Sequence, residues 1–233
     1  MKILVVNPNT SDIVLEVIMR SANRVASAGT ELVGMRSPGG TRNIDSAYGD
    51  YMSAQHMIEA VRRRVESEAF DAVVLAGFGN VGISALKEIL DIPAVSISEA
   101  SMALACLLGH RFSTLTMIEQ FIPYQEDIVR LYGFEAKLAS VRAININVEE
   151  AATDRERTLR DLTVQVKALV AEDRAEVVIL ACAGLCDYDR ELTEACGVPV
   201  IDPVVAGVRV AETLVTMGLC QSKIRKFNHP PQP

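Results

Sequence analysis

The cysteine at position 182 directly follows the apolar run EVVILA and precedes Ala183 and Gly184. A thiol placed just before a helix N-terminus has a lowered pKa, because the helix dipole favours the thiolate. Such a thiol can remove or deliver a proton at a carbon next to a carbonyl, provided that backbone N–H groups hold the enolate-like oxygen. Composition alone favours the plainer interpretation that Cys182 is a small buried packing residue.

A second candidate for chemistry is the stretch GFGNVG, in which Gly77, Gly79 and Gly82 follow the apolar run DAVVLA. Glu99 lies twenty residues beyond Gly79. A glycine turn that opens a helix, with a carboxylate further on, meets the requirements of dinucleotide binding. The same glycines also suit any tight strand-to-helix turn. An NAD(P)-dependent oxidoreductase is therefore one alternative function.

The two apolar runs are copies of an internal repeat. DAVVLAGFG (residues 71–79) matches EVVILACAG (residues 176–184), and Gly77 stands where the second copy has its cysteine. About a dozen residues after each run, Pro93 and Pro199 occupy matching positions. Two lobes related by a pseudo-twofold axis would explain the repeat, with the strand ends of both lobes facing one cleft.

Short apolar runs alternate with longer amphipathic segments along the chain, which is typical of an α/β fold. Runs that are apolar at every position predict parallel strands covered on both faces by helices. Strands are expected at residues 3–6, 31–35, 72–76, 94–97, 112–116, 140–144, 177–181 and 200–201. Helices are expected at residues 11–28, 52–67, 83–89, 99–108, 124–131, 148–171, 190–195 and 204–216. We predict two lobes, residues 1–98 with 204–233 and residues 99–203, each with a mostly parallel four-stranded sheet flanked by helices and the active site in the cleft between them.

Composition restricts the partners of the chain. A net charge of −7 argues against nucleic acid, and no apolar run approaches the roughly 20 residues of a membrane span. The N-terminal MKILVVNPNT lacks the features of a signal peptide. Five cysteines without a paired framework indicate a reduced, cytoplasmic protein. Cys186 and the three scattered histidines show no metal-ligand spacing, so we expect no metal.

Six segments together resemble the aspartate/glutamate/hydantoin racemase superfamily, most closely its hydantoin and allantoin racemase branch. They are ILVVNPNTS, VVLAGFGNVG, RFSTLTM, LYGF, ILACAGL and GVPVIDPVVAGV. The resemblance implies an enzyme without a cofactor, in which two cysteines flank a small-molecule substrate. One cysteine removes the proton α to a carbonyl and the other delivers a proton to the opposite face. We expect a homo-oligomer.

The sequence departs from this racemase pattern at the first cysteine, whose position falls on Gly77. Asn80 stands where the pattern has an aspartate. Symmetric two-thiol racemization therefore cannot run. The arylmalonate decarboxylase branch also has glycine at the first position, and there a C–CO₂⁻ bond breaks without a first base. By analogy, Gly77 would leave room for a carboxylate or another bulky leaving group. An artificial Cys-to-Gly exchange would also explain Gly77, although the accompanying Asn80 argues against it.

The resulting prediction is an enzyme that makes or breaks a bond α to a carbonyl, with Cys182 as the single thiol in decarboxylase- or isomerase-like chemistry. The resemblance implies a substrate-lining amide at Asn7 and a substrate-contacting hydroxyl at Thr116, and Tyr124 is a predicted donor to the cleft. Backbone N–H groups that could hold a carbonyl or carboxylate are those of Gly77, Phe78, Gly79, Asn80, Ala183 and Gly184. Turn formation, β-propensity and helix-start packing are the competing interpretations of these residues.

The sequence is also compatible with two other functions. A hydantoin or allantoin racemase would survive if another group or a water served as the first base. A non-catalytic small-molecule binding protein would also explain the missing thiol. The variant Cys182→Ser separates the binder from the enzymes, because a binder keeps its ligand affinity and has no turnover to lose.

Overall fold

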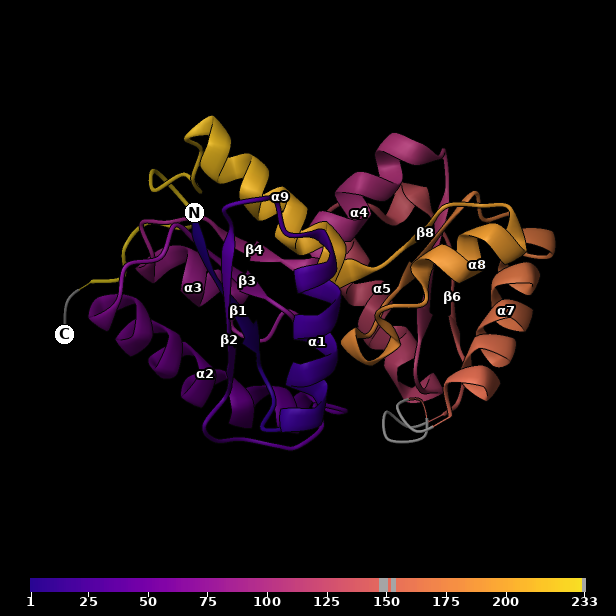
Figure 1. Cartoon of the computed structure of the whole chain (residues 1–233), viewed down its shortest axis with the longest axis horizontal. Coiled ribbons are helices and arrows are strands. Elements are labelled where there is room, and N and C mark those ends of the chain that lie inside the picture. Colours follow the sequence, from indigo (N-terminus) through magenta and orange to yellow (C-terminus); the bar gives the residue numbers. More distant parts are fainter. Residues whose placement is uncertain (147–150, 152–153, 232–233) are drawn as a thin grey trace.

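The computed structural model describes residues 1–146, 151 and 154–231, which form two α/β lobes side by side (Figure 1). Each lobe contains one parallel four-stranded sheet, and the strand orders are β2-β1-β3-β4 and β6-β5-β7-β8. The strands are β1 (Lys2–Asn7), β2 (Glu31–Arg36), β3 (Ala72–Leu75), β4 (Ala94–Ser96), β5 (Phe112–Thr116), β6 (Leu138–Ala143), β7 (Val177–Leu180) and β8 (Val200–Ile201). The predicted fold class is confirmed.

The strands are buried as their sequences predict. Every residue of the central strands β3, β5 and β7 is buried, because helices cover both faces of each sheet. The edge strands β2 and β6 keep partial exposure along their length. The completely apolar strands β3 and β7 therefore lie in the middle of their sheets. Gly77 follows β3, and Cys182 follows β7.

The helices also lie close to their predicted positions. They are α1 (Asp12–Val25), α2 (Ala47–Ser67), α3 (Ile83–Ile89), α4 (Ile97–Leu108), α5 (Ile122–Leu131), α7 (Arg155–Ala171), α8 (Asp189–Cys196) and α9 (Pro203–Met217). Three short 3-10 turns accompany them: η1 (Glu119–Phe121), η2 (Glu135–Lys137) and η3 (Ala183–Leu185). Helix α2 begins earlier than predicted, because the Ser46 side chain accepts the N–H of Gly49 and caps it there. The first residues of the helix predicted at 148–171 lie outside the described residues.

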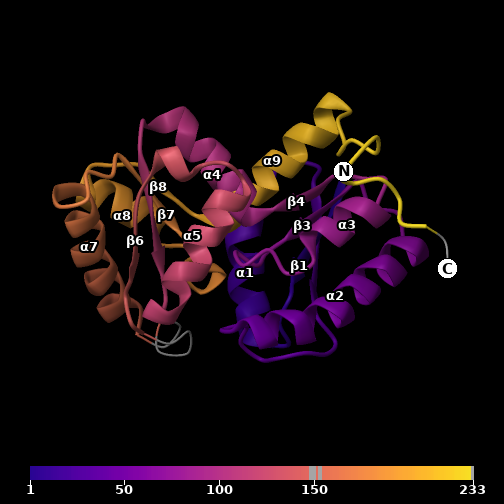
Figure 2. The same cartoon turned by 180° about the vertical axis from the view of Figure 1, so that it is seen from behind.

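The helices form three layers around the two sheets. Helices α2 and α3 cover the outer face of the first sheet, and α7 and α8 cover the outer face of the second (Figures 1 and 2). Helices α1, α4, α5 and α9 lie between the sheets. A single apolar core there contains residues from both sheets, including Val5, Val74, Val177 and Ile179. The two lobes are thus joined by buried apolar surface.

Backbone hydrogen bonds confirm the internal repeat residue by residue. The strand-ending bonds are Ala76 N–H to Val6 O and Ala181 N–H to Leu115 O, both 2.8 Å. The proline-turn bonds are Val73 N–H to Pro93 O (2.8 Å) and Val178 N–H to Pro199 O (3.0 Å). Gly77 and Cys182 are therefore equivalent positions, each two residues beyond the end of the third strand in its sheet.

The last helix of each repeat packs on the other repeat's sheet. Helix α4 follows β4 and contacts β5 and β7, whereas α9 follows β8 and contacts β3 and β4. Gly207 permits this close approach, because a Cβ there would meet Ile97 Cγ2 at 2.8 Å and Val74 Cγ1 at 3.1 Å. The predicted lobe boundaries remain a prediction, and the contacts of α9 with β3 and β4 are compatible with its assignment to the first lobe.

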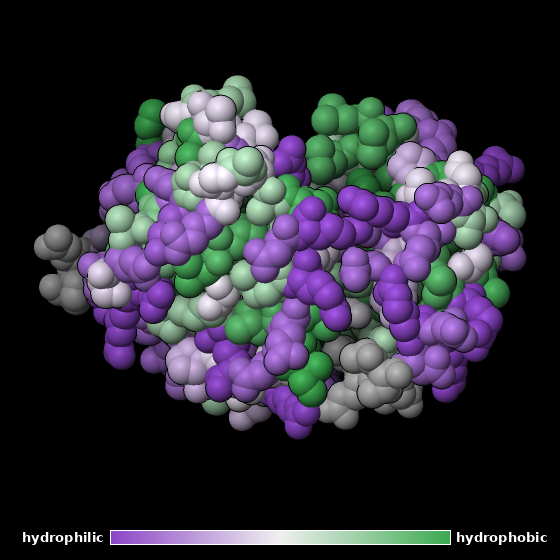
Figure 3. All heavy atoms as spheres, viewed as in Figure 1, coloured by the Kyte–Doolittle hydropathy of each residue, from purple (hydrophilic) through white to green (hydrophobic). Residues whose placement is uncertain are grey.

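The surface is mostly hydrophilic over the face that Figure 3 shows. An apolar area stands out at the C-terminal end of α4, where Leu107 and Leu108 are exposed (Figure 3). Within the described part of the chain, no helix combines the length and the hydropathy that crossing a membrane requires. The expected homo-oligomer stays a prediction.

Candidate active site

A cavity of about 240 Å³ lies where the C-terminal ends of four strands meet. Its walls come from the loops after β1 (residues 7–9), β3 (76–79), β5 (116–118) and β7 (181–184), and from residues 43–45 before α2. The carboxyl ends of parallel strands are the usual binding edge of α/β folds. The cavity volume suits a single-ring compound, since drug-sized ligands take roughly 300 Å³ or more.

Cys182 lies on this cavity wall and is half-buried. Its Sγ accepts the N–H of Gly184 at 3.4 Å and caps the turn η3. Burial raises the pKa of Cys182, while the N–H groups of Gly184 and Leu185 offset part of that rise. The expectation that the pKa of Cys182 is lowered was wrong. The segment after Cys182 is a single 3-10 turn with little dipole, so desolvation of the thiolate has the larger effect on the pKa. Cys182 is therefore a protonated thiol at neutral pH.

The position equivalent to Cys182 has no functional group and no spare room. A Cβ added at Gly77 would meet Pro8 Cγ at 2.5 Å and Pro8 Cδ at 3.2 Å. The space expected for a leaving group directly beside Gly77 is therefore filled by the Pro8 ring. Glycine and proline side chains carry no acid or base, so the position equivalent to Cys182 supplies no proton-transfer group.

We predict that Gly77→Cys lowers the free energy of unfolding by about 1–3 kcal/mol, the usual cost of overpacking. The rigid Pro8 ring cannot move aside as a flexible side-chain end would. Urea denaturation of the single variants and of Pro8→Ala/Gly77→Cys measures the coupling, and the Gly77→Cys cost should shrink in the Pro8→Ala background. A Gly77→Cys protein as stable as the parent would contradict this packing.

Asn7 lines the cavity but uses its amide to build the turn after β1. It is 1% exposed, and its Nδ2 donates to Asn9 Oδ1 at 2.8 Å and to Ser11 O at 3.0 Å. Ser11 caps α1 by accepting the N–H of Val14. The Asn-Pro-Asn turn thereby holds Pro8 against Gly77. Thr116, Phe78, Gly79, Ala183 and Gly184 also line the cavity.

Asn80 and Tyr124 lie outside the cavity lining. Asn80 has φ 64°, and its Oδ1 accepts the hydroxyls of Ser98 (2.6 Å) and Ser96, so it shapes the turn after β3. The Tyr124 hydroxyl lies 2.5 Å from Asp50 Oδ2 and 3.0 Å from the carbonyl oxygen of Gly79. Burial and the Asp50 carboxylate raise the pKa of Tyr124 far above its ordinary value. Tyr124 therefore joins α5 to α2 as a structural contact.

The dinucleotide interpretation of GFGNVG finds no support in this geometry. The protein's own side chains occupy the open faces of the glycines: Pro8 at Gly77, Tyr124 Cε1 3.2 Å from a Gly79 Cβ, and Ile58 Cδ1 2.9 Å from a Gly82 Cβ. The carboxylate proposed for a ribose, Glu99, is paired with Lys87 at 2.5 Å. These glycines are explained by close packing of side chains within the protein, and Glu99 is engaged in an ion pair.

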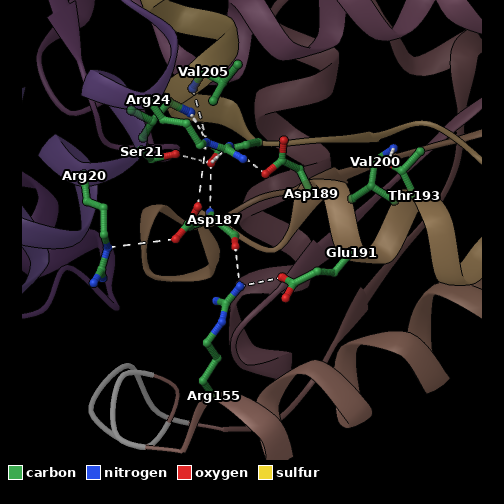
Figure 4. A network of polar contacts seen from close by, with 12 residues as sticks. Arg20, Ser21, Arg24, Arg155, Asp187, Asp189, Glu191, Thr193, Val200 and Val205 are labelled. Carbon is green, nitrogen blue, oxygen red and sulfur yellow. Dashed lines mark hydrogen bonds and ion pairs between the residues drawn. The ribbon is translucent and has the colours of Figure 1, made fainter.

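A buried carboxylate, Asp202, joins the segment that follows Cys182 to α1 through hydrogen bonds to Asp187 and Ser21, two residues labelled in Figure 4. Asp202 is 2% exposed and caps α9 by accepting the N–H groups of Val204 (2.8 Å) and Val205 (3.2 Å). Its other oxygen accepts the hydroxyl of Ser21 on α1 and the N–H of Asp187 (2.9 Å). The loop after Cys182 is therefore held by a group from each lobe.

Arg24 of α1 completes this network (Figure 4). Its Nη2 lies 2.7 Å from Asp189 and 3.5 Å from Asp202. Burial alone would lower the pKa of Arg24, but the surrounding carboxylates outweigh it and raise the pKa. Cys186 lies beside the same carboxylate, and burial together with Asp202 raises the pKa of its thiol strongly. Cys186 is buried, and its structural role stays a prediction.

Sequence reasoning missed Gln125, which lines the cavity at 1% exposure. Successive residues of a helix point about 100° apart, so Tyr124 faces α2 while Gln125 faces the cavity. Its Nε2 donates to the carbonyl oxygen of Ala181 at 3.1 Å. Gln125, Ile128 and Val129 form the buried stripe of α5, and a glutamine within such an apolar stripe is the signal that could have found it.

The cavity carries little charge. Among the described residues that line it, Cys182 and Asp45 are the ionisable side chains, and none is Lys, Arg or His. Across the described ranges 1–146, 151 and 154–231, no three His, Cys, Asp or Glu side chains gather in a way that could hold a metal ion. The arrangement can deliver one proton from Cys182 to a small compound and offers no cation to an anionic group.

Comparison with known proteins places the chain in a family. The family model described as Asp/Glu/Hydantoin racemase matches residues 3–211. The hydantoin racemase of Pseudomonas sp. (strain NS671) is 36% identical over 230 residues, which cover 99% of this chain and 92% of that protein. The hydantoin racemase of Paenarthrobacter aurescens is 34% identical, covering 99% of this chain and 98% of that protein.

Solved structures agree with these relatives. The allantoin racemase of Pseudomonas fluorescens superimposes with a TM-score of 0.93 at 38% identity and covers 100% of this chain and 99% of its own. Arylmalonate decarboxylase has a TM-score of 0.67 at 21% identity over 94% of both chains, a likeness of fold alone. With a family model spanning most of the sequence and full-length relatives above 30% identity, the chain belongs to the Asp/Glu/hydantoin racemase family.

Proposed function

We propose that this protein is a cofactor-independent enzyme that protonates an enolate-like carbon α to a carbonyl, with Cys182 as the single catalytic thiol. The substrate is a small hydantoin-like or carboxylate compound. The observation that carries the proposal is the asymmetry of the cavity, in which Cys182 supplies a thiol and its repeat equivalent, Gly77, is backed by Pro8. The hydantoin and allantoin racemases among the relatives support the hydantoin-like substrate class.

The proposed reaction begins when a carboxylate on the reacting carbon leaves as CO₂, and the bonding electron pair remains as an enolate. A hydantoin-like substrate would carry this carboxylate on the same carbon. The backbone N–H groups of the loop at residues 77–79 hold the enolate oxygen. The Cys182 S–H then gives its proton to the carbon, and water reprotonates the thiolate. The raised pKa suits this role, because a thiol that stays protonated is a proton donor throughout the neutral range.

Incubation in D₂O followed by NMR tests the proposal, with hydantoin, allantoin and phenylmalonate as probes. One-sided chemistry gives CO₂ release or an isomerised product that carries one deuteron at the reacting carbon and a single configuration. Absence of turnover with all three classes of probe, together with retained binding, would point to the non-catalytic binder and overturn the proposal.

Asp45 gives a second candidate function, racemization of a hydantoin-like compound with a substituted first base. Its carboxyl group is the other ionisable side chain among the described lining residues, and it comes from the loop before α2 in the lobe opposite Cys182. Racemization would show in D₂O as deuterium incorporation with inversion. It would also be lost in Asp45→Asn, whereas one-sided chemistry would persist in that variant.

The pH profile follows from the protonated thiol. Since burial raises the pKa of Cys182, the acid form is complete below the ordinary thiol range near 8.5. We expect kcat/KM to stay level between about pH 6 and about pH 8.5 and to fall only above the raised pKa, tenfold per unit. A rate that climbs with pH over the same interval would indicate a thiolate base and contradict the assigned role.

A further inference from the structure

The side-chain amide of Gln125 makes a hydrogen bond through its nitrogen and none through its oxygen. Nε2 donates to the carbonyl oxygen of Ala181 at 3.1 Å. A carbonyl oxygen can only accept a hydrogen bond, so the NH₂ group must face Ala181 and the orientation of the amide is fixed by chemistry. The remaining atom, Oε1, is buried and has no hydrogen-bond partner in the protein.

An unpaired buried carbonyl is costly, typically by about 1–3 kcal/mol. Gln125 is 1% exposed and lies on the cavity wall, so the adjacent space that could supply a donor is the substrate cavity. The neighbouring polar group of the same wall, the Ala181 carbonyl, already takes the Gln125 N–H. Oε1 of Gln125 therefore lacks an N–H or O–H donor from the protein.

The position of Gln125 near Cys182 restricts the kind of ligand group that could pair with Oε1. Ala181 directly precedes Cys182, so the hydrogen bond to its carbonyl places the Gln125 amide beside the residue that carries the reacting proton. The cavity has no Lys, Arg or His in its described lining, which favours a neutral N–H group over an anion at this point.

We propose that Gln125 is a specificity residue whose Oε1 accepts an N–H attached to the reacting carbon of the substrate. This inference rests on the proposed function and deepens it. Hydantoin-like compounds, the substrate class of the proposed function, carry such an N–H. Arylmalonate-type acids, which have no N–H, would leave the acceptor unpaired.

Binding measurements on the intact protein test the inference without any need for turnover. The probes are hydantoin, 1-methylhydantoin, which lacks the N–H beside the reacting carbon, and 3-methylhydantoin, which keeps it. Isothermal titration should show 1-methylhydantoin binding about 10- to 100-fold more weakly than hydantoin, and 3-methylhydantoin binding within about threefold of it. Equal affinity for hydantoin and 1-methylhydantoin, a larger loss with 3-methylhydantoin, or no binding of any probe would overturn the inference.

Two variants separate recognition from positioning. Gln125→Met keeps the size and removes the acceptor, so hydantoin affinity should fall and the preference over 1-methylhydantoin should disappear. Gln125→Glu keeps an acceptor and should retain that preference. If Gln125 only positions the strand end through Ala181, both variants would weaken all three probes alike and leave their ratio unchanged. If hydantoin binding depends on the N–H but no reaction occurs in D₂O, the proposed function is wrong and this inference still holds.

Discussion

Cys182→Ala is expected to lower kcat/KM by about a thousandfold or more, within the range that a general acid contributes. Among the described residues that line the cavity, Cys182 and Asp45 have the ionisable side chains. The Cys182 Sγ is the proposed proton donor, and alanine removes it with little change of volume. Cys182→Ser should retain a small residual rate, because a hydroxyl can occupy the site but is a far weaker acid. The loss should lie in kcat, while the Kd for hydantoin stays within a few fold.

The matched control for this result is Cys106→Ala. Cys106 is half-buried like Cys182 but packs against the interlobe core, away from the cavity. Its removal should leave kcat/KM within about twofold. The assignment of Cys182 would be wrong if both alanine variants kept the parental rate, or if both lost it equally.

Asp202→Ala is expected to reduce the free energy of unfolding by about 3–5 kcal/mol, the usual cost of leaving a buried ionic partner unpaired. The substitution removes the cap of α9 and the acceptor for Ser21 and Asp187. It also leaves the partly buried Arg24 without one of its carboxylates. Because the same network anchors the segment after Cys182, kcat should fall as well.

Asp154→Ala is the matched control for the network. Asp154 caps α7 by accepting the N–H of Arg157 and is exposed, so its removal deletes a cap alone and should cost about 1 kcal/mol. Urea denaturation of both variants gives the difference that belongs to the interlobe contacts. Equal losses in the two variants would show that Asp202 acts as nothing more than a helix cap.

The fold was largely predictable because its signals are local or repeated. Buried parallel strands such as β3 and β7 are apolar at every position, and the two copies of the strand-and-proline pattern predicted two equivalent sheets. The line-up of Gly77 with Cys182 followed from the same repeat, and the backbone hydrogen bonds of both copies agree with it.

The parts of the site that sequence did not predict depend on neighbours distant along the chain. The raised pKa of Cys182 depends on burial, which outweighs the N–H groups of the local turn. The room beside Gly77 depends on Pro8, almost seventy residues earlier. The choice between Tyr124 and Gln125 depends on how α5 is rotated against α2, and a helical pattern fixes that rotation only to within about one residue.

Because the last helix of each repeat packs on the sheet of the other repeat, the order of synthesis affects when each sheet is covered. Helix α9 is translated after every strand, yet it covers β3 and β4. A nascent chain that already contains both sheets still has the apolar face of the first one, including Val74, open to solvent or to a chaperone. The second sheet receives α4 much earlier. The first sheet, whose strand β3 leads to Gly77, is therefore covered completely only once α9 has emerged.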